Sequence, residues 1–406
     1  MSAQDLAAAV VLLLVAKRKR KRTRCWSKDW YTKRQKYTHE NLLKDLMLTE
    51  EADFKNFVRL DLEQFQELLE LVTPLIEKKN TNMREAIPPF QRLSITLRYL
   101  ATGNTLEDLK FHSAIAPQTI SLIITETCDA IIHVLKEFIK LPQTAEEWER
   151  VAKDFESQWN APHVIGAIDG KHVEIKKPPG SGSYYYNYKK TFSVVLMAVV
   201  NANYEFIMVD VGTNGRVSDG GVLQNTTFGK QLKNNALNIP PPALLPGSSR
   251  KLPYFFVGDD AFPMSQNLLK PYSQTRLTKE KRIYNYRISR ARRMVESVFG
   301  ILATRFGVFQ RAFPFNPTKV RKIVLACCYL HNFLRKSRSF LSPSFMFRED
   351  NESGIIHPPS LEVFQLPQLK NINIKNSLNI AKQARDEYNE FCNNEGAVPW
   401  QEKMVS

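Results

Sequence analysis

Four acidic residues could place their carboxylates together although they lie far apart in the sequence. Asp169 follows the apolar run VIGAI, Asp219 lies in GTNGRVSDGG, and Asp259 follows YFFVG. Glu296 comes next, in the basic stretch SRARRMVE. Carboxylates that meet at one point repel one another and need cations, and hard oxygen ligands suit Mg²⁺ or Mn²⁺. Such ions support in-line displacement at a phosphodiester, so the predicted chemistry is metal-dependent cutting or joining of nucleic acid strands.

Each acid also has a purely structural explanation. Asp169 followed by glycine, between two apolar runs, is a hairpin-turn signal. Asp219 could cap a helix, and Asp259 could form a turn at a strand end. Glu296 follows Arg292 by the spacing of a helical ion pair. Only a fold that brings the acids together favours a metal site over these alternatives.

The net charge is +16, and two segments concentrate the positive charge. Residues 1–37 hold eleven Lys and Arg against two Asp, and residues 270–311 hold eleven against two Glu. Clustered cations release counterions on meeting a phosphate backbone, so DNA is the predicted partner and a solvated basic surface the alternative. The run KRKRKR at residues 17–22 is typical of a nuclear import signal or a DNA-contacting arm, which favours the nucleus.

No membrane association and no disulfide framework are expected. The apolar run at residues 6–16 is too short to cross a bilayer as a helix. The five cysteines are an odd number without paired zinc spacing, which favours a reducing compartment.

The N-terminal half has a helical pattern. Within residues 38–153, Asp61 can cap a helix, and a short helix at 106–111 precedes a longer helix that opens at Pro117. This outline is that of a helix-turn-helix, with Gln118, Thr119 and Ser121 near the start of its second helix. A plain helical bundle is the alternative, because no Lys or Arg stands among those three residues.

The pattern then changes to strands. Residues 164–175, 191–200, 204–211 and 254–260 are β-rich, and helices are predicted from 218–219 and over 289–306, the latter with Ser289 as N-cap. We therefore predict an α/β domain, a mixed sheet flanked by helices, behind an N-terminal all-α domain. The predicted division is a basic arm (1–37), a helical domain (38–153), the α/β domain (154–336) and a polar tail with one helix (337–406).

Five motifs of this region occur in the same order as the motifs of a known family. GAIDGKHV, YYNYKKTFSVVLMAVVNAN, GTNGRVSDGGVLQNT, VGDDAFPM and YNYRISRARRMVESVFGILATRF resemble the motif series of the PIF/Harbinger transposases and the DDE nucleases derived from them. The resemblance implies an RNase H-like fold with catalytic acids at Asp169, Asp259 and Glu296, and Asp219 as a further metal ligand. Asp259 is preferred to Asp260 because it directly follows Gly258 of the motif.

The resemblance also implies partners. A separate Myb-like DNA-binding protein would accompany the chain, and a homo-oligomer is a further expectation. The tyrosines of YNYKK could stack on unpaired bases, although an amphipathic strand with outward tyrosines is the preferred explanation of Tyr184 to Tyr188. Cations in the motifs are predicted to contact the nucleic acid: Lys171, Lys189, Lys190, Arg287, Arg290, Arg292 and Arg293.

Three functions compete. The first is a divalent-metal-dependent DNA endonuclease, with strand transfer as an extension, and the second is a nuclear DNA- or chromatin-binding adaptor that keeps the fold without cutting. A carboxylate-pair hydrolase such as a glycosidase would explain the acids but neither basic segment. Retention of all four acids favours the endonuclease.

Overall fold

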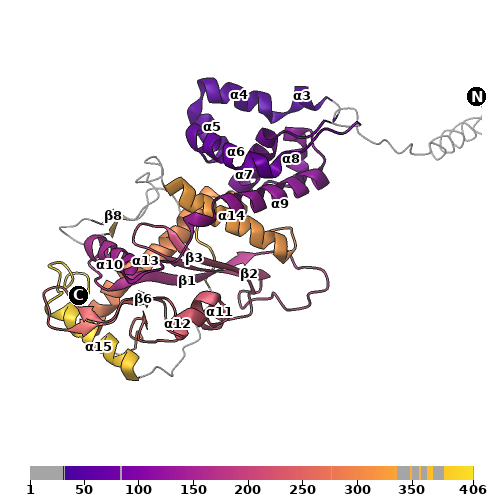
Figure 1. Ribbon diagram of the computed structural model, residues 1–406. Coiled ribbons are helices and arrows are strands. Elements are labelled where there is room, and N and C mark those ends of the chain that lie inside the picture. Colours follow the sequence, from indigo (N-terminus) through magenta and orange to yellow (C-terminus); the bar gives the residue numbers. More distant parts are fainter. Residues whose placement is uncertain are drawn as a thin grey trace, which may run out of the picture.

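The computed structural model describes residues 31, 33–82, 85–275, 277–335, 348–349, 356–357, 364–368 and 379–405. Most of the predicted basic arm, including the KRKRKR run, lies outside these residues. A helical bundle stands on an α/β body (Figure 1). One continuous apolar core runs from Leu43 in the bundle through Val320 in the α/β body, so the two parts share a common interior.

The bundle consists of short and medium helices. Asp61 occupies the N-cap of α6, as predicted, and Gly103 ends α7 with a left-handed φ of 63°. The elements are α3 (Arg34–Tyr37), α4 (His39–Thr49), α5 (Glu51–Val58), α6 (Leu62–Ile76), α7 (Pro89–Thr102), α8 (Leu106–Ser113), α9 (Pro117–Val134) and η1 (Lys136–Phe138).

The expected helix-turn-helix is not confirmed. Helices α8 and α9 meet at 96°, but α9 is the helix that packs against α14 (Pro317–Arg335) of the α/β body. Lys319 on α14 donates to the backbone oxygen and the hydroxyl of Ser121, at 2.7 and 2.6 Å. Ser121, expected near the start of a DNA-reading helix, therefore lies in the contact between the two parts.

The α/β body is built on a five-stranded sheet in the order β3-β2-β1-β6-β7. Strands β1, β2 and β3 are antiparallel neighbours, whereas β6 is parallel to β1 and β7 is parallel to β6. The apolar runs therefore form a mixed sheet, as predicted. The strands are β1 (Val164–Glu174), β2 (Ser193–Val200), β3 (Phe206–Asn214), β6 (Phe255–Val257) and β7 (Leu268–Leu269).

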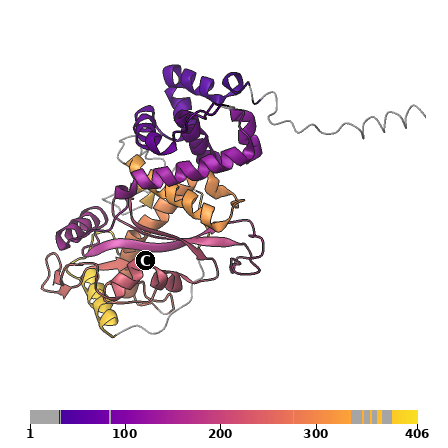
Figure 2. The ribbon, with the colours of Figure 1, turned by 45° about the vertical axis from the view of Figure 1, so that its right-hand side comes forward.

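Helices cover both faces of this sheet (Figures 1 and 2). Beyond the register shift between Val164 and Gly166, side chains of β1 alternate between two cores, since Ala167 and Val173 belong to one cluster and Ile168 to the other. The first face is covered by α13 (Lys279–Arg305) and α14, and the second cluster includes residues of α10 (Ala145–Trp159), α11 (Asp219–Asn225) and α12 (Thr227–Lys233). The sheet is thus the middle layer of three.

Two predicted boundaries need revision. Helix α13 begins at Lys279 with Thr278 as N-cap, because buried residues at helical spacing already start at Ile283; the predicted N-cap Ser289 lies inside the helix. Helix α15 (Asn379–Asn393) packs against α13 and buries Tyr388, so this part of the predicted tail belongs to the α/β body. The remaining elements are β4 (Ala243–Leu244), β5 (Lys251–Leu252), η2 (Gly307–Gln310), β8 (Arg348–Glu349) and β9 (Ile356–His357).

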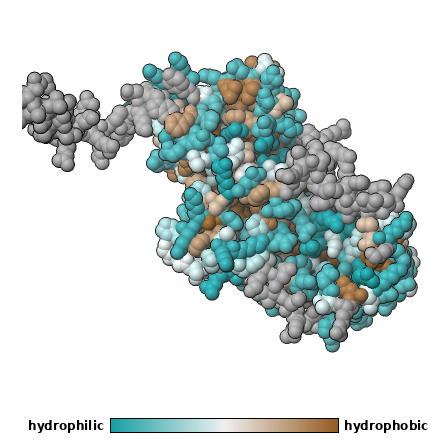
Figure 3. All heavy atoms as spheres, turned by 180° about the vertical axis from the view of Figure 1, so that it is seen from behind, coloured by the Kyte–Doolittle hydropathy of each residue, from teal (hydrophilic) through white to brown (hydrophobic). Residues whose placement is uncertain are grey.

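Seen from behind, the described surface is mainly hydrophilic, with an apolar patch on the helical bundle (Figure 3). Within the described residues, a membrane-crossing length of apolar helix occurs in no single element, and only α8 and α9 taken together reach it.

Candidate metal centre

Three aspartates converge beside the middle of β1, just beyond the end of β6. Asp169 lies on β1, Asp219 opens α11, and Asp259 follows β6 by two residues. Each offers a carboxylate oxygen, and these three oxygens lie within 4.8 Å of one another. The convergence has a simple origin: β1 and β6 are parallel neighbours, so a residue that follows β6 comes to lie beside the distal half of β1. The structure places Asp259, rather than the neighbouring Asp260, in the group.

The group is buried and incompletely hydrogen-bonded. Asp169 and Asp219 are 3% and 1% exposed. Asp169 accepts a hydrogen bond from the Gly170 backbone N–H, and Asp259 accepts one from the Ala261 N–H, both at 2.9 Å. Oδ1 of Asp219 is buried without a hydrogen-bond partner. Because an unsatisfied buried carboxylate oxygen is costly, the chemistry of this atom fits a site that binds a cation.

Burial, and after it mutual repulsion, raises the pKa values of two members of the group. Burial, followed by the charges of Asp169 and Asp259, raises the pKa of Asp219 to about 9. Burial and the charge of Asp169 raise the pKa of Asp259 to about 6, although the Ala261 N–H and the charge of Arg292 act in the opposite direction. A divalent cation among the three carboxylates would relieve this repulsion, and an all-oxygen donor set fits Mg²⁺ or Mn²⁺.

A lysine serves as an internal counterion. Nζ of Lys171 lies 2.8 Å from Oδ2 of Asp169 and 5.8 Å from the centre of the Phe299 ring on α13. Lys171 is 1% exposed, so its predicted contact with nucleic acid needs correction. The signal was present in the sequence: residues two apart on a strand share a face, so Asp169 and Lys171 had to point the same way.

Glu296 lies outside the group of three. It sits on α13, is about a quarter exposed, and pairs with Arg292 one turn earlier at 3.0 Å. This is the helical ion pair that the sequence offered as an alternative role. Arg292 also acts on Asp259, whose pKa its charge lowers, so the pair borders the centre without contributing to the cluster.

The other predicted cations divide into two sets. Lys189 and Lys190 are exposed, and Arg292 and Arg293 are half-buried. Arg287 and Arg290 are 4% and 1% exposed, so a phosphate at the surface cannot reach them.

These two buried arginines hold the C-terminal segment in place. Arg287 donates to the backbone oxygens of Asn160 and Gly396 and to the side chain of Gln401, at 2.6, 2.7 and 2.9 Å. Arg290 lies over the ring of Trp400 at 5.6 Å. The prediction that they contact nucleic acid is wrong because segments distant in the sequence cover them.

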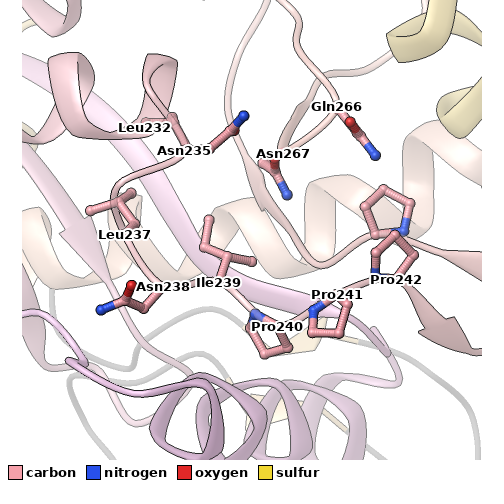
Figure 4. A pocket seen from close by; sticks show the side chains of 11 residues that line it. Leu232, Asn235, Leu237, Asn238, Ile239, Pro240, Pro241, Pro242, Gln266 and Asn267 are labelled. Carbon is pink, nitrogen blue, oxygen red and sulfur yellow. The ribbon is translucent and has the colours of Figure 1, made fainter.

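A separate cavity of about 230 Å³ lies near the end of α12 (Figure 4). Pro240, Pro241 and Pro242 form one edge, and the amides of Asn235, Gln266 and Asn267 stand around it. None of the clustered aspartates lines it, so the cavity is distinct from the acidic centre.

Comparison with known proteins identifies the class of the α/β domain. Residues 168–332 match the family described as DDE superfamily endonuclease, a range that contains all four acids. The chain is 26% identical over 300 residues to "Protein ALP1-like" of Arabidopsis thaliana, covering 70% of this chain and 71% of that protein.

Two nuclease-named relatives are similar over most of their length. "Putative nuclease HARBI1" of Rattus norvegicus is 25% identical over 268 residues, covering 65% of this chain and 72% of the relative. Its namesake in Homo sapiens is 24% identical over 255 residues, covering 62% and 69%. No solved structure matches the chain significantly. Residues 168–332 therefore carry a DDE superfamily endonuclease domain, and the similarity to these relatives confirms the resemblance to Harbinger transposase-derived nucleases.

Proposed function

We propose that this protein is a divalent-metal-dependent DNA endonuclease with its reactive centre at Asp169, Asp219 and Asp259. The observation that carries the proposal is the meeting of three buried carboxylates from β1, α11 and the segment after β6, one of which keeps an oxygen without a hydrogen-bond partner. An RNase H-like arrangement of the α/β body is part of the proposal, supported by the strand order β3-β2-β1-β6-β7.

The three aspartates would hold Mg²⁺ or Mn²⁺. Bound there, the cation supplies Lewis-acid stabilisation for the charge that develops on a transferring phosphoryl group. The protein contributes a dry, preorganised setting, because β1 and α11 fix two of the carboxylates in the interior.

Two basic side chains of the protein offset the charge of the acids in the folded state. Lys171 neutralises Asp169 from within the core, and Arg292 neutralises Glu296 at the edge of the centre. We include Glu296 in the catalytic set as a proposal: if Arg292 turns to a DNA phosphate, the Glu296 carboxylate is released beside the centre. Arg292 and Arg293 are half-buried on α13 and would contact the backbone of bound DNA.

The cellular setting is also a proposal. The basic arm supports DNA as the substrate and the nucleus as the location. A Myb-like partner would supply sequence-specific binding, since α9 packs against α14 and is poorly placed to read a groove. We also propose that the protein forms a homo-oligomer. A strand-transfer step would follow cleavage at the same centre.

The test is nicking of supercoiled plasmid DNA with Mg²⁺ or Mn²⁺, with EDTA as a blank. Wild type should nick, whereas Asp169→Asn and Asp259→Asn should not. Asp210→Asn is the matched control because Asp210 lies on β3 of the same sheet, outside the cluster. If wild type binds DNA but never nicks it, even with a Myb-like partner, the nuclease proposal fails and the adaptor function replaces it.

A further inference from the structure

The connection between β1 and β2 carries an unusual combination of side chains. Residues 175–192 contain four lysines and no acidic residue. The lysines, Lys176, Lys177, Lys189 and Lys190, are all exposed. The connection extends beyond the sheet (Figures 1 and 2). It therefore forms a purely cationic projection beside the candidate metal centre.

Three tyrosines are exposed on this projection. Tyr184, Tyr186 and Tyr188 are 58%, 41% and 47% exposed, which is high for large aromatic side chains. The segment is a series of turns with a single bridge between Tyr186 and Phe192, so the amphipathic strand preferred from the sequence is not what forms. Strand alternation therefore does not account for the outward tyrosines.

A buried asparagine fixes the shape of the segment. Asn187 is 3% exposed, and its Oδ1 accepts from the backbone N–H groups of Lys189 and Thr191 at 3.0 and 3.1 Å. Its Nδ2 donates to the hydroxyl of Ser193 at 2.9 Å, and that hydroxyl lies 2.8 Å from Nδ1 of His172 on β1. The tyrosines on either side of Asn187 are thus presented by a preorganised turn, which lowers the entropy cost of binding.

The same turn adjoins the carboxylates. The ring of Tyr188 lies 5.9 Å from the ring of His172, which follows Asp169 by three residues on β1. The charge of Asp219 contributes, after burial, to a raised pKa of the Tyr188 hydroxyl. The hydroxyl donates to the backbone oxygen of Gln368 at 2.7 Å, which steadies the ring. A nucleic acid strand at the metal centre would therefore pass near Tyr188, and Tyr186 and Tyr184 lie two and four residues before it in the same connection.

We propose that residues 184–190, here called the tyrosine loop, form a stacking site for unpaired bases of a nucleic acid strand, with Lys189 and Lys190 on its phosphates. Aromatic faces bind any base, and adjacent cations follow the backbone, which is how proteins hold single strands without sequence preference. Fully paired DNA keeps its bases stacked internally and cannot use the rings. The inference rests on the proposed function only in taking nucleic acid as the substrate.

The test compares strand types in EDTA, where no cleavage occurs. Fluorescence anisotropy would give the affinity for a labelled single-stranded oligonucleotide and for the fully paired duplex of the same sequence. A Tyr184→Leu, Tyr186→Leu double variant removes two aromatic faces, and a Tyr184→Phe, Tyr186→Phe variant is the matched control that keeps them. Circular dichroism and thermal unfolding would verify that both variants fold.

The expected result is a loss of single-strand affinity on the order of tenfold or more for the leucine variant. Duplex affinity should stay within about twofold, and the phenylalanine variant should resemble wild type. Lys189→Gln with Lys190→Gln should weaken both strand types. The proposal is overturned if the leucine variant weakens both strand types equally, or behaves like the phenylalanine variant. A protein that holds single strands through these tyrosines yet never nicks plasmid would refute only the nuclease proposal.

Discussion

Replacing Asp219 by asparagine should stabilise the metal-free protein at pH 8. Asp219 is almost fully buried, its Oδ1 has no hydrogen-bond partner, and two other carboxylates lie within 4.8 Å. Burial and the charges of Asp169 and Asp259 raise the pKa of Asp219 from 3.8 to about 9. The folded protein therefore retains a proton that the unfolded chain releases above about pH 4.

The size of this stabilisation follows from the linkage between proton binding and folding. Between the unfolded and folded pKa values the folded state binds more protons, so the free energy of unfolding falls as the pH rises through this window. At about 1.4 kcal/mol per unit, the interval from 3.8 to pH 8 corresponds to an upper value of about 6 kcal/mol. A buried asparagine amide with an unmet hydrogen bond costs about 1–3 kcal/mol, and the largest of these costs leaves a net gain of about 3 kcal/mol. For a domain of this size that is a rise in Tm of about 6–12 °C.

The assay is thermal unfolding at pH 5 and pH 8, in EDTA and in Mn²⁺. The gain of Asp219→Asn over wild type should be larger at pH 8 than at pH 5, and Mn²⁺ should stabilise wild type more than the variant. Asp210→Asn is the control, because burial raises the pKa of Asp210 too but Asp210 lies outside the cluster. A variant less stable than wild type at pH 8 in EDTA, or a gain independent of pH, would refute the reasoning.

Three further predictions follow from the same structure. Glu296→Gln should reduce both plasmid nicking and stabilisation by Mn²⁺. Its control, Glu280→Gln at the exposed start of the same helix, should change neither. Equal behaviour of the two variants would exclude Glu296 from the centre. Arg287→Met should lower the free energy of unfolding in urea by about 3 kcal/mol, since it removes three hydrogen bonds of a buried guanidinium. It should leave DNA affinity within about twofold, and a selective loss of affinity would contradict its structural role. Deletion of residues 1–37 should flatten the dependence of DNA affinity on salt, and an unchanged slope would mean that the arm does not contact phosphates.

Local sequence patterns predicted much of the α/β body. The β-branched run around Asp169 had to form a buried strand, and the acids at strand and helix boundaries were visible as interruptions of apolar runs. Asp61 likewise marked the start of a helix through short-range chemistry. The start of α13 was misplaced because Ser289 is also a good capping residue, and only the burial of Ile283 by other elements favours the earlier start.

The sequence by itself determined the residue types at the centre, because Asp169, Asp219 and Asp259 each follow or interrupt an apolar or glycine-rich run. Tertiary structure alone decided which of the acids meet, because the position of α13 along β1 brings Phe299 near Lys171 and leaves Glu296 outside the group of three. It also decided that Arg287 is a structural residue, since its partner Gln401 is 114 residues away. Contacts over such separations depend on how layers pack, and no local pattern encodes them.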